Sequence, residues 1–173
     1  MANADTVTTL DAVHAGILTA LRAQFPAFKT VEAYRTDRSS VALPACLIDM
    51  TEMEAAMDID PGTEQLAVTA RFEAILIIGF KQGRGVNAKL EIRKLAAAVA
   101  AFTRLHRWGC PIGPAQVIGA YPDEFNPELD QFECWRVEWT NVIHLGQSVW
   151  NWPPDAIPEP YTSLGDAGGY APL

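Results

Sequence analysis

The chain has 173 residues, 49% of them hydrophobic, and carries a formal net charge of −8 at pH 7. This length fits one domain of ordinary size, and the apolar content allows a sizeable core. Because an acidic surface repels DNA phosphates, the composition disfavours a DNA-binding module.

The sequence carries no sign of a membrane or secretory segment. Its longest strongly apolar run covers residues 74–80, whereas a helix that spans a bilayer needs roughly 20 apolar residues. The first eleven residues lack a basic stretch followed by an apolar one, which disfavours a secretory signal. Cys46, Cys110 and Cys134 are widely spaced and odd in number. This pattern disfavours a disulfide framework and favours a protein kept reduced in a cytosol.

An amphipathic helix is predicted over residues 9–24. Its apolar residues recur at a spacing of three to four positions and would form one buried stripe, namely Leu10, Val13, Ile17 and Leu21. Thr8 or Thr9 can cap its start, and Pro26 ends it. A short strand over residues 30–36 and a second strand over residues 45–55 are expected to follow.

A turn at residues 58–62 leads into the clearest strand, at residues 64–80. Its apolar residues occupy every second position, namely Leu66, Val68, Ala70, Phe72, Ala74, Leu76, Ile78 and Phe80. The opposite face begins with Arg71 and Glu73 and becomes apolar at Ile75 and Ile77. One end of the strand should therefore be covered on both faces. We expect a long β-hairpin with a projecting tip near residues 56–63.

A second helix is predicted over residues 88–105, with Asn87 as its cap. Strands are expected over residues 115–121 and 131–145. The order of elements is then helix, two or three strands, helix and two strands. This order predicts an α+β fold, in which two helices pack on one face of an antiparallel or mixed sheet. No internal repeat is present.

Residues 147–173 differ in composition from the rest of the chain. They are rich in proline and glycine, which disfavours a core of their own, yet they contain Trp150, Trp152 and Tyr161. Aromatic residues of this kind anchor interfaces. We therefore expect a domain over residues 1–146 and an extended proline-rich arm over residues 147–173 that docks on another surface.

The patterns that carry enzyme chemistry are incomplete. Residues 83–88 match a G-x-G-x-x-A loop between a strand and a helix. A dinucleotide site also needs an acidic residue about twenty positions later, where His106 and Arg107 stand. Cys110 is a candidate exposed thiol, but the sequence places no base beside it. Neither His nor Cys spacing fits a zinc site. We therefore predict no enzyme, cofactor or metal site.

The hairpin around residues 49–64 is acidic. Asp58, Asp60 and Glu64 lie near its tip, and the spacing of a calcium-binding EF-hand loop is absent. A solvated or partner-facing acidic surface is the expected role. Together with Trp150, Trp152 and Tyr161, these residues form the predicted interface set.

The order of elements and several local patterns resemble a known family. The patterns are residues 17–21 in the first helix, 44–48, the strand segment 72–78, and residues 135–139 through 143–146. Over residues 9–146 the chain resembles the tail terminator, or tail completion, proteins of tailed bacteriophages, including Mu-like and lambda-like phages. No residue of a catalytic motif is carried over.

This resemblance implies a structural virion protein assembled in the host cytoplasm. Its subunits would form a homo-hexameric ring at the head-proximal end of the tail. The partners would be the tail tube protein and a neck or head-completion protein, with genomic DNA passing through the ring without specific binding. The open alternatives are another neck or connector ring protein, and a small enzyme that uses Cys110 or the glycine loop at Gly83 and Gly85.

Overall fold

The computed structural model describes residues 7–35, 41–56, 62, 65–79, 87–123, 132–148, 161–163 and 170–172. The helices are α1 (Leu10–Gln24) and α2 (Ala88–Thr103). The strands are β1 (Thr30–Ala33), β2 (Ala45–Ala55), β3 (Leu66–Gly79), β4 (Gln116–Pro122), β5 (Phe132–Leu145), β6 (Tyr161–Ser163) and β7 (Tyr170–Pro172). The predicted order of helices and strands up to residue 145 is confirmed.

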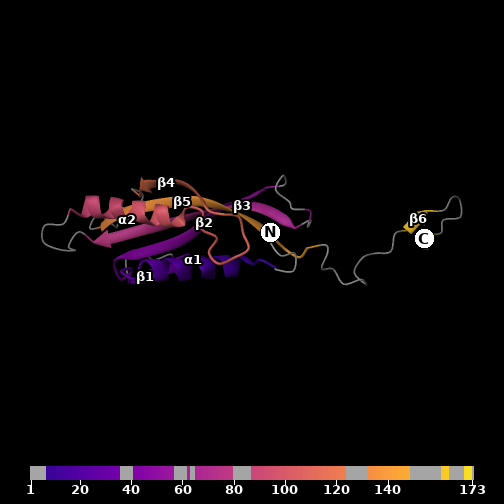
Figure 1. The fold of residues 1–173 in the computed structure, drawn as a ribbon, viewed down its shortest axis with the longest axis horizontal. Helices are drawn as coiled ribbons and strands as arrows, with labels where there is room; N and C mark the ends of the chain where they lie inside the picture. Colours follow the sequence, from indigo (N-terminus) through magenta and orange to yellow (C-terminus); the bar gives the residue numbers. More distant parts are fainter. Residues whose placement is uncertain are drawn as a thin grey trace.

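Five strands form one mixed sheet in the order β1-β2-β3-β5-β4. β1 runs parallel to β2, and the pairs β2–β3, β3–β5 and β5–β4 are antiparallel. β2 and β3 are the arms of the predicted long hairpin. β3, α2 and β4 form a split β-α-β unit. The helix α2 connects β3 to β4, and β5 lies between these two strands in the sheet. The helices extend along the long direction of the sheet (Figure 1).

Both helices pack on the same face of the sheet, as predicted. Val13, Ile17 and Leu21 from α1 are fully buried in one core with Ile92 and Val99 from α2. The sheet contributes its alternating residues to this core, namely Val68, Ala70, Phe72, Ala74, Leu76, Val137, Trp139 and Ile143. The alternation in the two central strands therefore sets which face the helices cover.

The other face of the sheet is apolar at one end only. Ile75 and Ile77 of β3 pack with Ala45 and Leu47 of β2, and all four side chains are buried. Leu43, which precedes β2, is among the partly buried residues that pack against them. The prediction that one end of β3 is covered on both faces is confirmed. Toward the hairpin tip the same face becomes polar.

The two helix starts differ in how they are capped. Thr9 accepts a hydrogen bond from the Ala12 N–H through its side chain at 3.2 Å. Asn87 occupies the corresponding position of α2, but its side chain makes no capping hydrogen bond. Its carbonyl oxygen accepts from the N–H groups of Leu90 and Glu91 instead. Asn87 is therefore the N-cap residue of α2, as predicted, and it caps the helix without a side-chain hydrogen bond.

The connection from α2 to β4 is anchored by a buried polar contact. The indole N–H groups of Trp108 and Trp139 both donate to Asn141 Oδ1 at 3.1 Å. Asn141 Nδ2 donates to the Gly113 carbonyl at 2.8 Å. Asn141 is 1% exposed, so these bonds satisfy polar atoms that water does not reach. One asparagine thereby ties the α2–β4 connection to the C-terminal half of β5.

Two short strands occur in the C-terminal arm, where none was predicted. β6 and β7 pair antiparallel in a sheet of their own, with Thr162 opposite Ala171.

Neither described helix combines the length and apolar character needed to cross a bilayer.

Candidate interface on the open face of the sheet

The face of the sheet that the helices do not cover is called the open face here. Three carboxylates lie side by side across it. Asp49 of β2 pairs with Glu73 of β3, and Glu73 pairs with Glu138 of β5. We call Asp49, Glu73 and Glu138 the carboxylate row. Carboxylates directly opposite one another repel, so such a row requires nearby cations. Its residues lie beyond the apolar end of this face, toward the hairpin tip.

Two arginines supply that positive charge. Arg71 Nη2 donates to Glu138 Oε2 at 2.5 Å, and Arg71 Nη1 lies 3.5 Å from Glu52. Arg136 Nε lies 2.8 Å from Glu138 Oε1, although its N–H has no aligned hydrogen bond there. Glu138 is therefore held between two guanidinium groups, and its side chain is only 9% exposed.

Tyr121 and Gly119 of β4 help to explain why Glu138 is buried on an open face. Gly119 stands opposite Glu138 in the β4–β5 pairing. A Cβ at Gly119 would lie 2.4 Å from the Tyr121 hydroxyl. The tyrosine ring thus occupies the space that a side chain at Gly119 would fill. The register shift in β4 between Val117 and Gly119 brings this glycine into place.

The pKa of Glu73 in this row is raised above its ordinary value. Burial raises its pKa, the Arg136 guanidinium opposes that rise, and the charges of Asp49, Glu138 and Asp123 add to it. The guanidinium of Arg71 is favoured in its charged form, because the hydrogen bond to Glu138 raises its pKa. The surface therefore combines strong local pairing with an excess of carboxylates.

The predicted interface residues are largely outside the described residues. Asp58, Asp60, Glu64, Trp150 and Trp152 all lie outside them. Tyr161 begins β6, and only its backbone is described.

The acidic part of β2 is described. Glu52 and Glu54 are exposed on it. The carboxylate row was missed, because the sequence indicates that Asp49, Glu73 and Glu138 share a polar face of their strands but not that they stand in register.

The three cysteines differ in burial. Cys46 is fully buried under the helices, and burial raises its pKa to about 12. Cys134 is half-buried and packs against the apolar end of the open face. Cys110 is also half-buried. Its sulfur lies 3.5 Å from the Ala12 carbonyl oxygen, and burial raises its pKa.

The described residues contain no group of three or more His, Cys, Asp or Glu side chains that could hold a metal ion. Residues 83–86 of the glycine loop lie outside the described ranges, so the nucleotide-loop alternative is not tested by them. His14 of α1 contacts Tyr34, which follows β1. Its Nδ1 lies 2.7 Å from the Leu10 carbonyl oxygen, and its Nε2 lies 2.5 Å from the Tyr34 hydroxyl.

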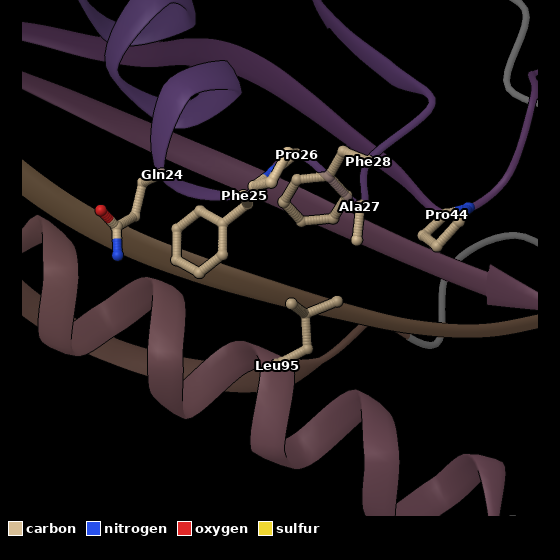
Figure 2. A pocket seen from close by; sticks show the side chains of 7 residues that line it. All are labelled: Gln24, Phe25, Pro26, Ala27, Phe28, Pro44 and Leu95. Atoms are coloured by element: carbon tan, nitrogen blue, oxygen red, sulfur yellow. The ribbon is translucent and has the colours of Figure 1, made fainter.

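A separate apolar pocket of about 290 Å³ lies where α1 ends. Its lining includes Phe25, Pro26 and Phe28 after α1, Pro44 before β2, and Leu95 of α2. Figure 2 shows Leu95 pointing from α2 toward the chain that follows α1. The Lys29 N–H donates to the Pro44 carbonyl at 2.8 Å, which fixes two of the walls relative to each other.

Comparison with known proteins does not identify a family. No protein-family model and no curated protein matches the chain. Among solved structures, one chain shares 11% sequence identity with this protein and covers 82% of it and 99% of its own length, with a TM-score of 0.49. The functional proposal therefore rests on the resemblance of residues 9–146 and on the geometry described above.

Proposed function

We propose that this chain is a structural protein of a phage particle. It is a tail terminator subunit that forms a sixfold ring on the head-proximal end of the tail tube and offers a surface to the neck. The resemblance over residues 9–146 motivates this proposal. An α+β subunit with one open sheet face and a long hairpin is consistent with it, because both features are available for contacts between subunits.

The observation that carries the proposal is the open face with its carboxylate row. Glu138 is neutralised by Arg71 and Arg136, while Asp49, Glu73 and Glu52 leave an acidic excess on the same face. A surface of this sign repels phosphates, so a ring that presents it to passing DNA would not retain the DNA. The same charges can pair with a basic patch on a neighbouring subunit.

The surroundings of the Cys110 thiol favour a structural role for this protein over a catalytic one. A catalytic thiol is activated by a lowered pKa or an adjacent base. The Cys110 sulfur instead faces the carbonyl oxygens of Ala12 and Trp108, and burial raises its pKa. Replacing Cys46, Cys110 and Cys134 by alanine is accordingly expected to affect folding alone. Loss of a measurable turnover in a folded, assembling variant would contradict this.

Electron microscopy of the particle tests the proposal. Averaged images of the head-proximal tail end are expected to contain six copies of this chain above the tail tube. A ring of twelve copies placed nearer the head would favour the alternative neck protein. Particles made without the gene should accumulate tails that do not join heads, and supplying the wild-type gene should restore joining. Infectious particles of normal yield without this chain would refute the proposal.

A further inference from the structure

The apolar pocket at the end of α1 is suited to binding an apolar side chain. Phe25 packs edge-on against Phe28 and Phe102, with ring centroids 5.8 and 5.7 Å away. At about 290 Å³ the pocket is at the small end of the range for ligand sites. Among the described residues that line it, Gln24 is the one with a polar side chain. Small-molecule sites normally contain several polar groups that orient the ligand, so this lining suits apolar side chains better.

The chain itself contains a segment of matching chemistry. Residues 150–154 read Trp-Asn-Trp-Pro-Pro. Proline-rich segments dock on grooves lined by aromatic rings, because they lose little backbone entropy on binding. The pocket offers such rings together with Pro26 and Pro44. A tryptophan also buries a large apolar area when it enters a pocket of this kind.

Trp150 and Trp152 cannot reach the Pro44 wall of the pocket in their own subunit. Leu145 pairs with Leu66 at one end of β3, whereas Ala45, next to Pro44, pairs with Ile77 at the other. Eleven strand residues at about 3.3 Å each separate these rows by about 36 Å. Trp152 follows Leu145 by seven residues, which extend at most about 24 Å. Trp150 and Trp152 can therefore contact the Pro44 wall only in another copy of the chain.

We propose that this pocket receives residues 150–154 of a second copy of the chain, with Trp150 or Trp152 inserted between Phe28 and Leu95. The contact links one subunit to the next through the start of the arm. It is independent of the proposed tail function, since it concerns only two copies of this protein. If two copies do not make this contact, the ring proposal is unaffected, and electron microscopy of the particle still tests it.

A labelled peptide of residues 148–156 provides the probe. The acceptor is the full chain carrying Trp150→Ala and Trp152→Ala, which keeps the pocket and lacks the anchors. Fluorescence anisotropy is expected to give saturable binding. Adding Ala27→Arg, at an exposed position of the pocket lining, should weaken binding by at least about tenfold. Ala97→Arg, at an exposed position of α2 outside the lining, is the matched control and should leave affinity unchanged.

A second comparison separates a neighbouring copy from the same chain. The wild-type protein, assayed at low concentration, should bind the peptide as tightly as the acceptor variant, because its own tryptophans cannot occupy its pocket. Wild-type affinity weaker by about tenfold or more would mean that the arm fills its own pocket. That result would overturn the proposal. Absence of saturable binding, or equal weakening by Ala27→Arg and Ala97→Arg, would overturn it as well.

Discussion

Arg71 of β3 donates to Glu138 of β5 at 2.5 Å, joining residues 67 positions apart in the chain. Because Glu138 also contacts Arg136, removing the carboxylate leaves two guanidinium groups near each other. We expect Glu138→Gln and Arg71→Met each to lower the free energy of unfolding. The double variant should lose less than the sum of the two, because the interaction is removed only once. Urea unfolding of all four proteins measures this coupling, and strict additivity would contradict it.

Asn141→Leu is expected to destabilise the protein by about 2–4 kcal/mol, since it leaves two indole N–H groups and one carbonyl oxygen without buried partners. Those groups belong to Trp108, Trp139 and Gly113. Denaturant unfolding followed by tryptophan fluorescence provides the measurement. Thr140→Val, at the adjacent half-buried position on the open face, is the control and should have a much smaller effect. Equal losses from both variants would refute the role given to Asn141.

Gly16→Ala in α1 tests the packing of the helix against the α2–β4 connection. In an exposed helix this change raises stability by about 1 kcal/mol. Here the added Cβ would lie 2.3 Å from the Trp108 carbonyl oxygen, which is backbone and cannot easily move. We therefore expect a loss of about 1–3 kcal/mol. Thr19→Ala, at an exposed position of the same helix, should be neutral or stabilising. A Gly16→Ala protein that is more stable than the wild type would show that the Trp108 backbone moves to make room for the added Cβ.

The buried thiol of Cys46 should make the free energy of unfolding depend on pH. Its pKa rises from 9.0 to about 12 on folding, so the folded state retains the thiol proton. The associated stability is complete below pH 9 and is lost as the pH rises from 9 toward 12. Between pH 8 and pH 10 the wild type should lose about 1.4 kcal/mol more than Cys46→Val does. Urea midpoints at both pH values test this, and parallel losses in the two proteins would exclude a contribution from Cys46.

Removing residues 155–173 separates the body from most of the arm. The truncated chain should keep its melting temperature within about 2 °C, because the described core ends before this segment. Under the proposed function, tails made with this chain should assemble poorly or fail to join heads. Peptide binding to the apolar pocket should persist in the truncated protein. Normal yields of infectious particles would remove any assembly role from residues 155–173.

The sequence predicts most of the fold because its apolar residues follow one period in each element. The alternation from Leu66 to Ile78 identified β3, and the spacing of Val13, Ile17 and Leu21 identified α1. Strand neighbours were not predictable in the same way. The parallel pairing of β1 with β2, and the place of β5 between β3 and β4, depend on contacts between distant segments.

The candidate interface was less predictable than the fold. Asp49, Glu73 and Glu138 each appear in the sequence as outward-facing strand residues, but a row forms only when three strands align. Asn141 was missed for a related reason. It occupies a core-facing position in β5, yet an asparagine there has no partner until Trp108 and Gly113 arrive from another segment. The interface residues predicted from composition, such as Trp150 and Asp58, lie outside the described residues.

The sheet is covered on both faces around Ile75 and Ile77, and on one face only toward the hairpin tip. Resistance to local opening should therefore fall along the length of each central strand. Backbone amides near Leu76 are expected to exchange with deuterium only when the whole domain unfolds, while those near Glu54 exchange through brief local opening. The subunit thus has a rigid end and a compliant end. The compliant end can adjust its shape to a neighbour without disturbing the core.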